Sequence, residues 1–153
     1  MHGSKEKISL WSVNGRGGLE LSNPRLSGRN VFRLDATLTV DGETYSIEVE
    51  LSTPFREQLL AFFHNLAVNS RQGVASHVSQ RVTTWRSDFS EISMNAVSQD
   101  DQSVRIAILF QWPPTYAEDV GHTLLVKAND VARVSNELRS FLRLPLELQS
   151  DAS

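Results

Sequence analysis

Apolar and polar residues alternate with a period of two over residues 32–51, which is the clearest pattern in the chain. The apolar positions are Phe32, Leu34, Ala36, Leu38 and Val40, and then Tyr45, Ile47, Val49 and Leu51. Successive side chains of a strand point to opposite faces, and the intervening Asp41-Gly42 suits a two-residue type I′ turn. The pattern therefore predicts a β-hairpin over Val31–Leu51 with one buried face and one solvated face.

The same alternation predicts a second pair of strands at Glu91–Ala96 and Val104–Trp112. Ala107 and Leu109 fall on the otherwise polar side of the latter strand, so we expect it to lie centrally or to be covered. Weaker strand candidates are Ile8–Val13, Gly18–Leu21, Val82–Trp85 and His122–Lys127. The Gly-rich segment Asn14–Gly18 is interpreted as a hairpin turn, because no helix follows it as a phosphate-binding loop requires.

Two segments have the helical period instead. The first follows Thr53-Pro54, a favoured helix start, and the second begins at Asn129 or Asp130 and is expected to end at Pro145. Their apolar stripes are Phe55, Leu59, Phe62, Phe63 and Leu66 in the first, and Val131, Val134, Leu138, Phe141 and Leu142 in the second. Each stripe predicts a helix that lies with one side on a sheet.

These elements predict an α+β fold, with an antiparallel sheet of about six to eight strands and two amphipathic helices packed on one face. Residues 1–153 are expected to form a single domain, with 1–6 and 146–153 as mobile tails. The two halves share a layout of strands followed by a helix. Asn69–Ser90 is the least regular part and is interpreted as a crossover connection, its order left open.

Composition narrows the classes of function. The absence of cysteine excludes disulfides, thiolate nucleophiles and cysteine-ligated zinc. With 18 acidic and 15 basic residues the net charge is −3, which argues against a nucleic-acid partner. No apolar run reaches the roughly 18 residues that a membrane helix needs. The start Met1–Lys7 lacks the apolar core of a signal peptide, so a cytoplasmic protein is expected.

No catalytic or metal-binding motif is present in the sequence. The four histidines, at positions 2, 64, 77 and 122, have no ligand-like spacing, and no nucleophile elbow or P-loop occurs. We therefore predict no catalytic residue, metal or cofactor, and no enzymatic activity. The alternative is a small-ligand-binding protein or hydrolase whose site lies between helices and sheet and uses Arg33, Asp88 or His122.

Aromatic residues outside the helical stripes suggest a binding surface. Trp and Arg are enriched at interface hot spots, so the candidate partner-binding residues are Trp85, Arg86, Asp88, Trp112 and Tyr116. The competing interpretation is that these rings cap the ends of the core, since Trp is highly buried on average.

The chain resembles a family of uncharacterised bacterial domains related in layout to small toxin-immunity proteins. The matching segments are Gly15–Leu21, Tyr45–Leu51, Leu59–Leu66, Trp85-Arg86-Ser87, Glu91–Ala96, Val104–Ile108 and Leu138–Leu142, and the chain departs from the family in Asn69–Arg81. The resemblance implies an α+β domain with immunity-like partner binding and supplies no functional residues.

Together these observations favour a non-enzymatic protein-binding module that neutralises a partner protein. Its acidic charge favours a basic partner. A homodimer that pairs sheet edges or sheet faces is the third alternative.

Overall fold

The computed structural model describes residues 7–27, 31–50, 53–71, 80–83, 91–98, 102–111 and 118–151. The strands are β1 (Lys7–Trp11), β2 (Gly17–Ser27), β3 (Val31–Val40), β4 (Glu43–Glu50), β5 (Gln80–Thr83), β6 (Glu91–Ser98), β7 (Ser103–Gln111) and β8 (Val120–Lys127). The helices are α1 (Thr53–Arg71), after β4, and α2 (Ala128–Asp151), after β8. Each half of the chain is thus a run of strands followed by one helix, as its layout suggests.

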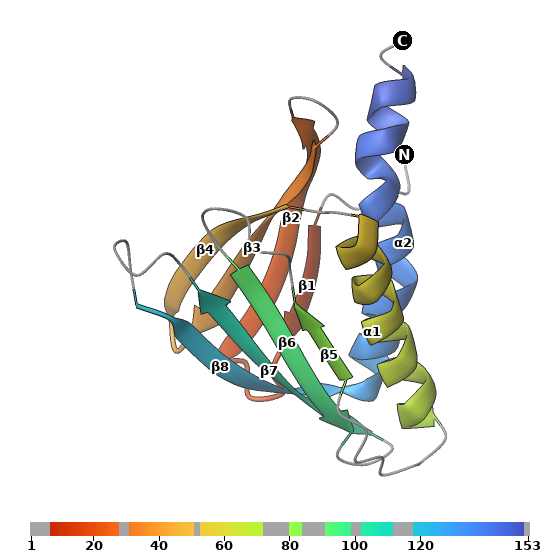
Figure 1. The fold of residues 1–153 in the computed structure, drawn as a ribbon. Coiled ribbons are helices and arrows are strands. Elements are labelled where there is room, and N and C mark those ends of the chain that lie inside the picture. Colours follow the sequence, from red (N-terminus) through yellow and green to blue (C-terminus); the bar gives the residue numbers. More distant parts are fainter. Residues whose placement is uncertain are drawn as a thin grey trace.

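The strands form two antiparallel sheets rather than one. β1–β4 make one four-stranded sheet and β5–β8 the other, each in sequence order. The two sheets cross, and both helices stand side by side along one side of the pair (Figure 1). The α+β class and the antiparallel pairing are confirmed, whereas the single sheet with helices on one face is wrong. Alternation shows which face of a strand is buried but does not show which strands pair.

A single hydrophobic core lies between the two sheets and the two helices. The inner faces of both sheets contribute fully buried residues, such as Leu34 and Leu38 from β3 and Ile106 and Phe110 from β7. The helices fill the open side between the sheets: α1 contacts β5, β6 and β7, and α2 contacts β1, β2, β7 and β8. Since each sheet buries only one face, the opposite face of each sheet is left for solvent or a partner.

The predicted hairpin is confirmed in detail. Val40 pairs with Glu43, so Asp41 and Gly42 form a two-residue turn, and their φ angles are 50° and 89°. Positive φ at both positions is what a type I′ turn requires.

β2 is much longer than the segment Gly18–Leu21 predicted from alternation. Its pairing with β3 shifts between Ser22 and Arg25, and Asn23 within this bulge has a φ of 54°. The bulge accommodates Pro24, which has no N–H to donate to the ladder. A proline therefore interrupts the pattern without ending the strand.

α2 continues to Asp151, so the prediction that Pro145 ends it is wrong. A proline removes one backbone hydrogen bond, which bends or weakens a helix but does not stop later turns from forming. Neither helix is long and apolar enough to cross a membrane over the described residues.

The two sheets approach each other closely at Gly17. A Cβ atom at this position would lie 2.6 Å from Nε2 of His122 and 3.2 Å from Cδ2 of Leu124, both on β8. Glycine is therefore what allows β2 to pass β8 at this distance.

Replacing Gly42 with alanine tests the type I′ turn. The substitution has open space around its Cβ but forces a positive φ on a residue that disfavours it. We expect the free energy of unfolding in urea to fall by about 1 kcal/mol. Gly121→Ala is the matched control, because its Cβ makes only ordinary contacts, the nearest at 3.4 Å, with no positive φ. Equal losses in both variants would contradict the turn assignment.

A double-mutant cycle tests the contact between the sheets. Gly17→Ala should lower the free energy of unfolding by about 1–3 kcal/mol, because its Cβ overlaps the His122 ring. In a His122→Ala background the same substitution should cost about 1 kcal/mol less, since the overlapping ring is gone. Additive effects of the two substitutions would show that β2 and β8 do not meet here.

Candidate functional site

The outer face of β1–β4 is charged, and its charges are paired. Arg25 contacts Glu48 and also Asp35, the latter at 3.2 Å, while Arg33 lies 2.9 Å from Glu48. Lys7 on β1 pairs with Glu20 on β2 at 2.8 Å. Such exposed pairs contribute little stability, but each one neutralises a cation. This face therefore offers little free positive charge to a partner.

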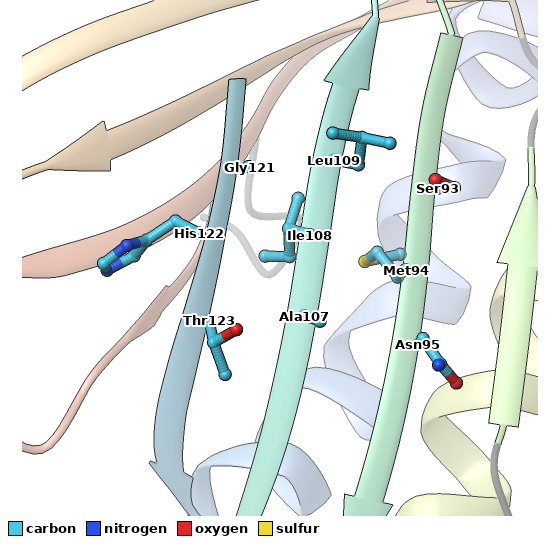
Figure 2. A pocket seen from close by; sticks show the side chains of 9 residues that line it. All are labelled: Ser93, Met94, Asn95, Ala107, Ile108, Leu109, Gly121, His122 and Thr123. Atoms are coloured by element: carbon cyan, nitrogen blue, oxygen red, sulfur yellow. The ribbon is translucent and has the colours of Figure 1, made fainter. Parts of the chain in front are cut away.

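On the other sheet, a pocket of about 590 Å³ opens across β6, β7 and β8 (Figure 2). We call it the β6–β8 pocket. It is lined by Ser93, Met94, Asn95, Ala107, Ile108, Leu109, Gly121, His122 and Thr123. Met94 and Ile108 point into the core. The side chains that face the pocket therefore belong to their neighbours along each strand, which point to the outer face of the sheet.

Two cross-strand rows form the pocket. Leu109 pairs with Ser93 and Gly121, and Ala107 pairs with Asn95 and Thr123. Most of these side chains are small, so the pocket is wide and shallow rather than deep. Its described lining residues offer hydroxyl and amide groups, and none of them is a carboxylate.

Charge changes along the strands from one end of this face to the other. Beyond Thr123 come Leu125, paired with Arg105, and Lys127, paired with Ser103. Neither Arg105 nor Lys127 has an ion pair with any described residue. At the opposite end, the Gln111 amide donates to Asp119 at 3.3 Å. Among the described residues, the pocket therefore lies between an end with two cations and an end with an acidic residue.

Arg33 and His122, the described residues proposed for a hydrolytic site, do not converge. Arg33 lies on the outer face of β3 and pairs with Glu48. Figure 2 shows the ring of His122 extending away from β7, and this ring packs against Gly17. Asp88 lies outside the described residues. Over the described parts of the chain, no three His, Asp or Glu side chains gather as metal ligands.

The candidate partner-binding residues Trp85, Arg86, Asp88, Trp112 and Tyr116 all lie outside the described residues. Their role stays a prediction. In the sequence, the first three follow β5 closely and the other two follow β7.

Sequence reasoning missed the β6–β8 pocket. The available signal was the pair Ala107 and Leu109, whose outward positions predict a central or covered strand. The structure confirms that β7 is central, since it lies between β6 and β8. What the sequence could not show was that Thr123 and Asn95 flank Ala107, because this depends on the register of three strands.

The outer faces of the two sheets meet where β1 ends. The Val13 amide donates to the Leu125 carbonyl at 2.8 Å, and the Ser12 hydroxyl bonds the same oxygen at 3.2 Å. Leu125 follows Thr123 of the pocket by two residues along β8. The surface of the β6–β8 pocket thus continues onto the end of β1.

Comparisons with known proteins identify the fold but no family. No protein-family model and no curated protein sequence matches the chain. The solved structure of the plant transcriptional regulator PBF-2 is 9% identical, with a TM-score of 0.54 over 95% of this chain and 84% of that one. That of WHY3 from Arabidopsis thaliana is 10% identical, with a TM-score of 0.55 over 99% of this chain and 95% of that one.

The likeness to a transcriptional regulator overturns two predictions made from the sequence. The immunity-like protein-binding module and its small-ligand-binding alternative are wrong, because the chain shares its fold with a plant transcriptional regulator. The hydrolase alternative and the expectation of no enzymatic activity both stay predictions. The exclusion of a nucleic-acid partner is also wrong. It relied on the net charge of the whole chain, which averages paired charges on one sheet with two cations on the other that have no ion pair with a described residue. The comparisons thus place this chain with plant regulators in fold alone.

Proposed function

We propose that the protein binds single-stranded nucleic acid on the outer face of β5–β8. The observation that carries this proposal is the β6–β8 pocket, which is open, has no carboxylate among its described lining residues and is adjacent to Arg105 and Lys127, which have no ion pair with a described residue. The shared fold with a plant transcriptional regulator favours a partner in gene expression, of which nucleic acid is one.

The lining of the pocket suits the edges of nucleobases. Ser93 and Thr123 offer hydroxyl groups that donate and accept, and Asn95 offers an amide that does both. An Asn side chain can bond the adenine edge in a bidentate manner. Leu109 and Ala107 add apolar surface against which a base can lie. The pocket combines the polar and apolar contacts that a base needs.

The shape of this face favours a single strand over a duplex. The major groove of B-DNA is about 12 Å wide and admits a helix or a two-stranded ribbon. A face of three or more strands backed by a second sheet is too broad to enter it. Unpaired bases, by contrast, can spread over a sheet surface, a mode that several RNA- and DNA-binding folds use.

Positive charge lies along the borders of this face. Arg105 and Lys127 are both exposed beside the pocket. A phosphate backbone crossing the sheet would therefore meet these two cations.

The salt dependence of binding tests the phosphate contacts. With Arg105 and Lys127 as the contacts, the slope of log K against log[salt] for a single-stranded oligonucleotide should be about −1.4. Arg105→Ala and Lys127→Ala should each reduce its magnitude by about 0.7. Fluorescence anisotropy of a labelled oligonucleotide at several salt concentrations measures both.

Arg139→Ala is the control, because Arg139 is exposed on α2 and lies beside α1 rather than on the proposed face. If single strands fail to bind at low salt, or if all three variants keep the wild-type slope, the proposal is wrong.

A carboxylate introduced into the β6–β8 pocket tests whether the oligonucleotide binds there. Ala107→Glu would add a negative charge to the centre of the face and should weaken oligonucleotide binding at least about tenfold, or about 1.4 kcal/mol. Ala61→Glu is the matched control, since Ala61 is also exposed but lies on α1. Circular dichroism confirms that both variants fold. Equal affinities for the two variants would place the binding site elsewhere.

A further inference from the structure

The large apolar side chains that remain exposed gather at one place. Among the described residues these are Trp11 (46% exposed), Val13 (53%) and Leu125 (36%), which we call the junction patch. Val13 and Leu125 are joined by the 2.8 Å backbone hydrogen bond between β1 and β8. The patch therefore lies where the outer faces of the two sheets meet, and it adjoins the β6–β8 pocket through Leu125.

Trp11 lies flat on the neighbouring strand. Its cross-strand partner is Gly18, and a Cβ at Gly18 would fall 2.6 Å from Cδ2 and Cε3 of the ring and 2.9 Å from Cζ3. The six-membered part of the indole thus occupies the space that any other residue at position 18 would need. One ring face rests on Gly18, and the exposure of Trp11 shows that much of the rest faces solvent.

A flat indole ring held in this way is a surface for stacking. Every base has a π face, so stacking on an aromatic side chain needs no hydrogen-bond match. Arg16, in the turn after β1, is exposed and has no ion pair with a described residue. A base on Trp11 would therefore have a cation nearby for its phosphate.

We propose that Trp11 stacks an unpaired nucleobase, and that the ligand strand runs from the β6–β8 pocket across the junction patch to this ring. The inference rests on the proposed function and extends it by naming a second contact. Three facts support the path: Thr123 lines the pocket, Leu125 follows it on the same strand, and Val13 links Leu125 to Trp11.

Gly18 acts through Trp11, as a positioning residue. Because Gly18 has no Cβ, the indole ring of Trp11 has room to lie flat on β2. The conformation is suited to stacking before any ligand arrives, which lowers the entropy cost of binding.

The test compares oligonucleotides with and without bases. Trp11→Ala should weaken binding of a normal single strand about tenfold, in line with the stacking of one base. It should leave unchanged the affinity of a strand of equal length whose bases are replaced by abasic spacers. Trp11→Phe should retain most of the affinity, and Gly18→Ala should lower it, because its Cβ displaces the ring. His64→Ala, which removes an exposed ring on α1, is the control.

The outcomes separate the two proposals. If the wild-type protein binds no single strand, the proposed function fails and the stacking role falls with it. If the wild type binds and Trp11→Ala binds equally well, only the stacking role is overturned. An unchanged affinity together with a changed mass in sedimentation would show that the junction patch is a contact between copies of the chain, which also overturns it.

Discussion

The shared core between the two sheets is the constraint on which the rest of this structure depends. Each sheet buries one face against the other sheet and the helices, through residues such as Leu38, Ile106 and Phe110. Removing a buried aromatic side chain from such a core costs about 3–5 kcal/mol, so the pairing of the layers is tightly determined. Because the inner faces are buried in this core, only the outer faces of the sheets remain accessible to a ligand.

The two outer faces differ in how their charges are used. On β1–β4, Lys7, Arg25 and Arg33 each contact a carboxylate on a neighbouring strand. On β7 and β8, Arg105 and Lys127 are left without such partners among the described residues. A chain with a net charge of −3 can therefore present a cationic border to a phosphate backbone, since the interaction is local at physiological salt.

Glycines at the junction shape the proposed binding surface. Gly17 lets β2 pass close to His122 of β8, and Gly18 lets Trp11 lie flat. These adjacent residues point to opposite faces of β2, so one serves the contact between sheets and the other the outer surface. The stability of the fold and the exposure of an aromatic ring are thus connected through two neighbouring positions.

The sequence alone determined the local elements. Alternation predicted the strands of residues 32–51 and the Asp41-Gly42 turn, and the apolar stripes predicted both helices, because these patterns depend on neighbours along the chain. Pro145 misled because the helix continues past it to Asp151.

Only the tertiary structure decided that the strands divide into two sheets and that Asn95, Ala107 and Thr123 share one row. It also decided that Trp11 rests on Gly18. Register and the packing of one sheet on another join residues that are distant along the chain, and no local period encodes which of them will meet.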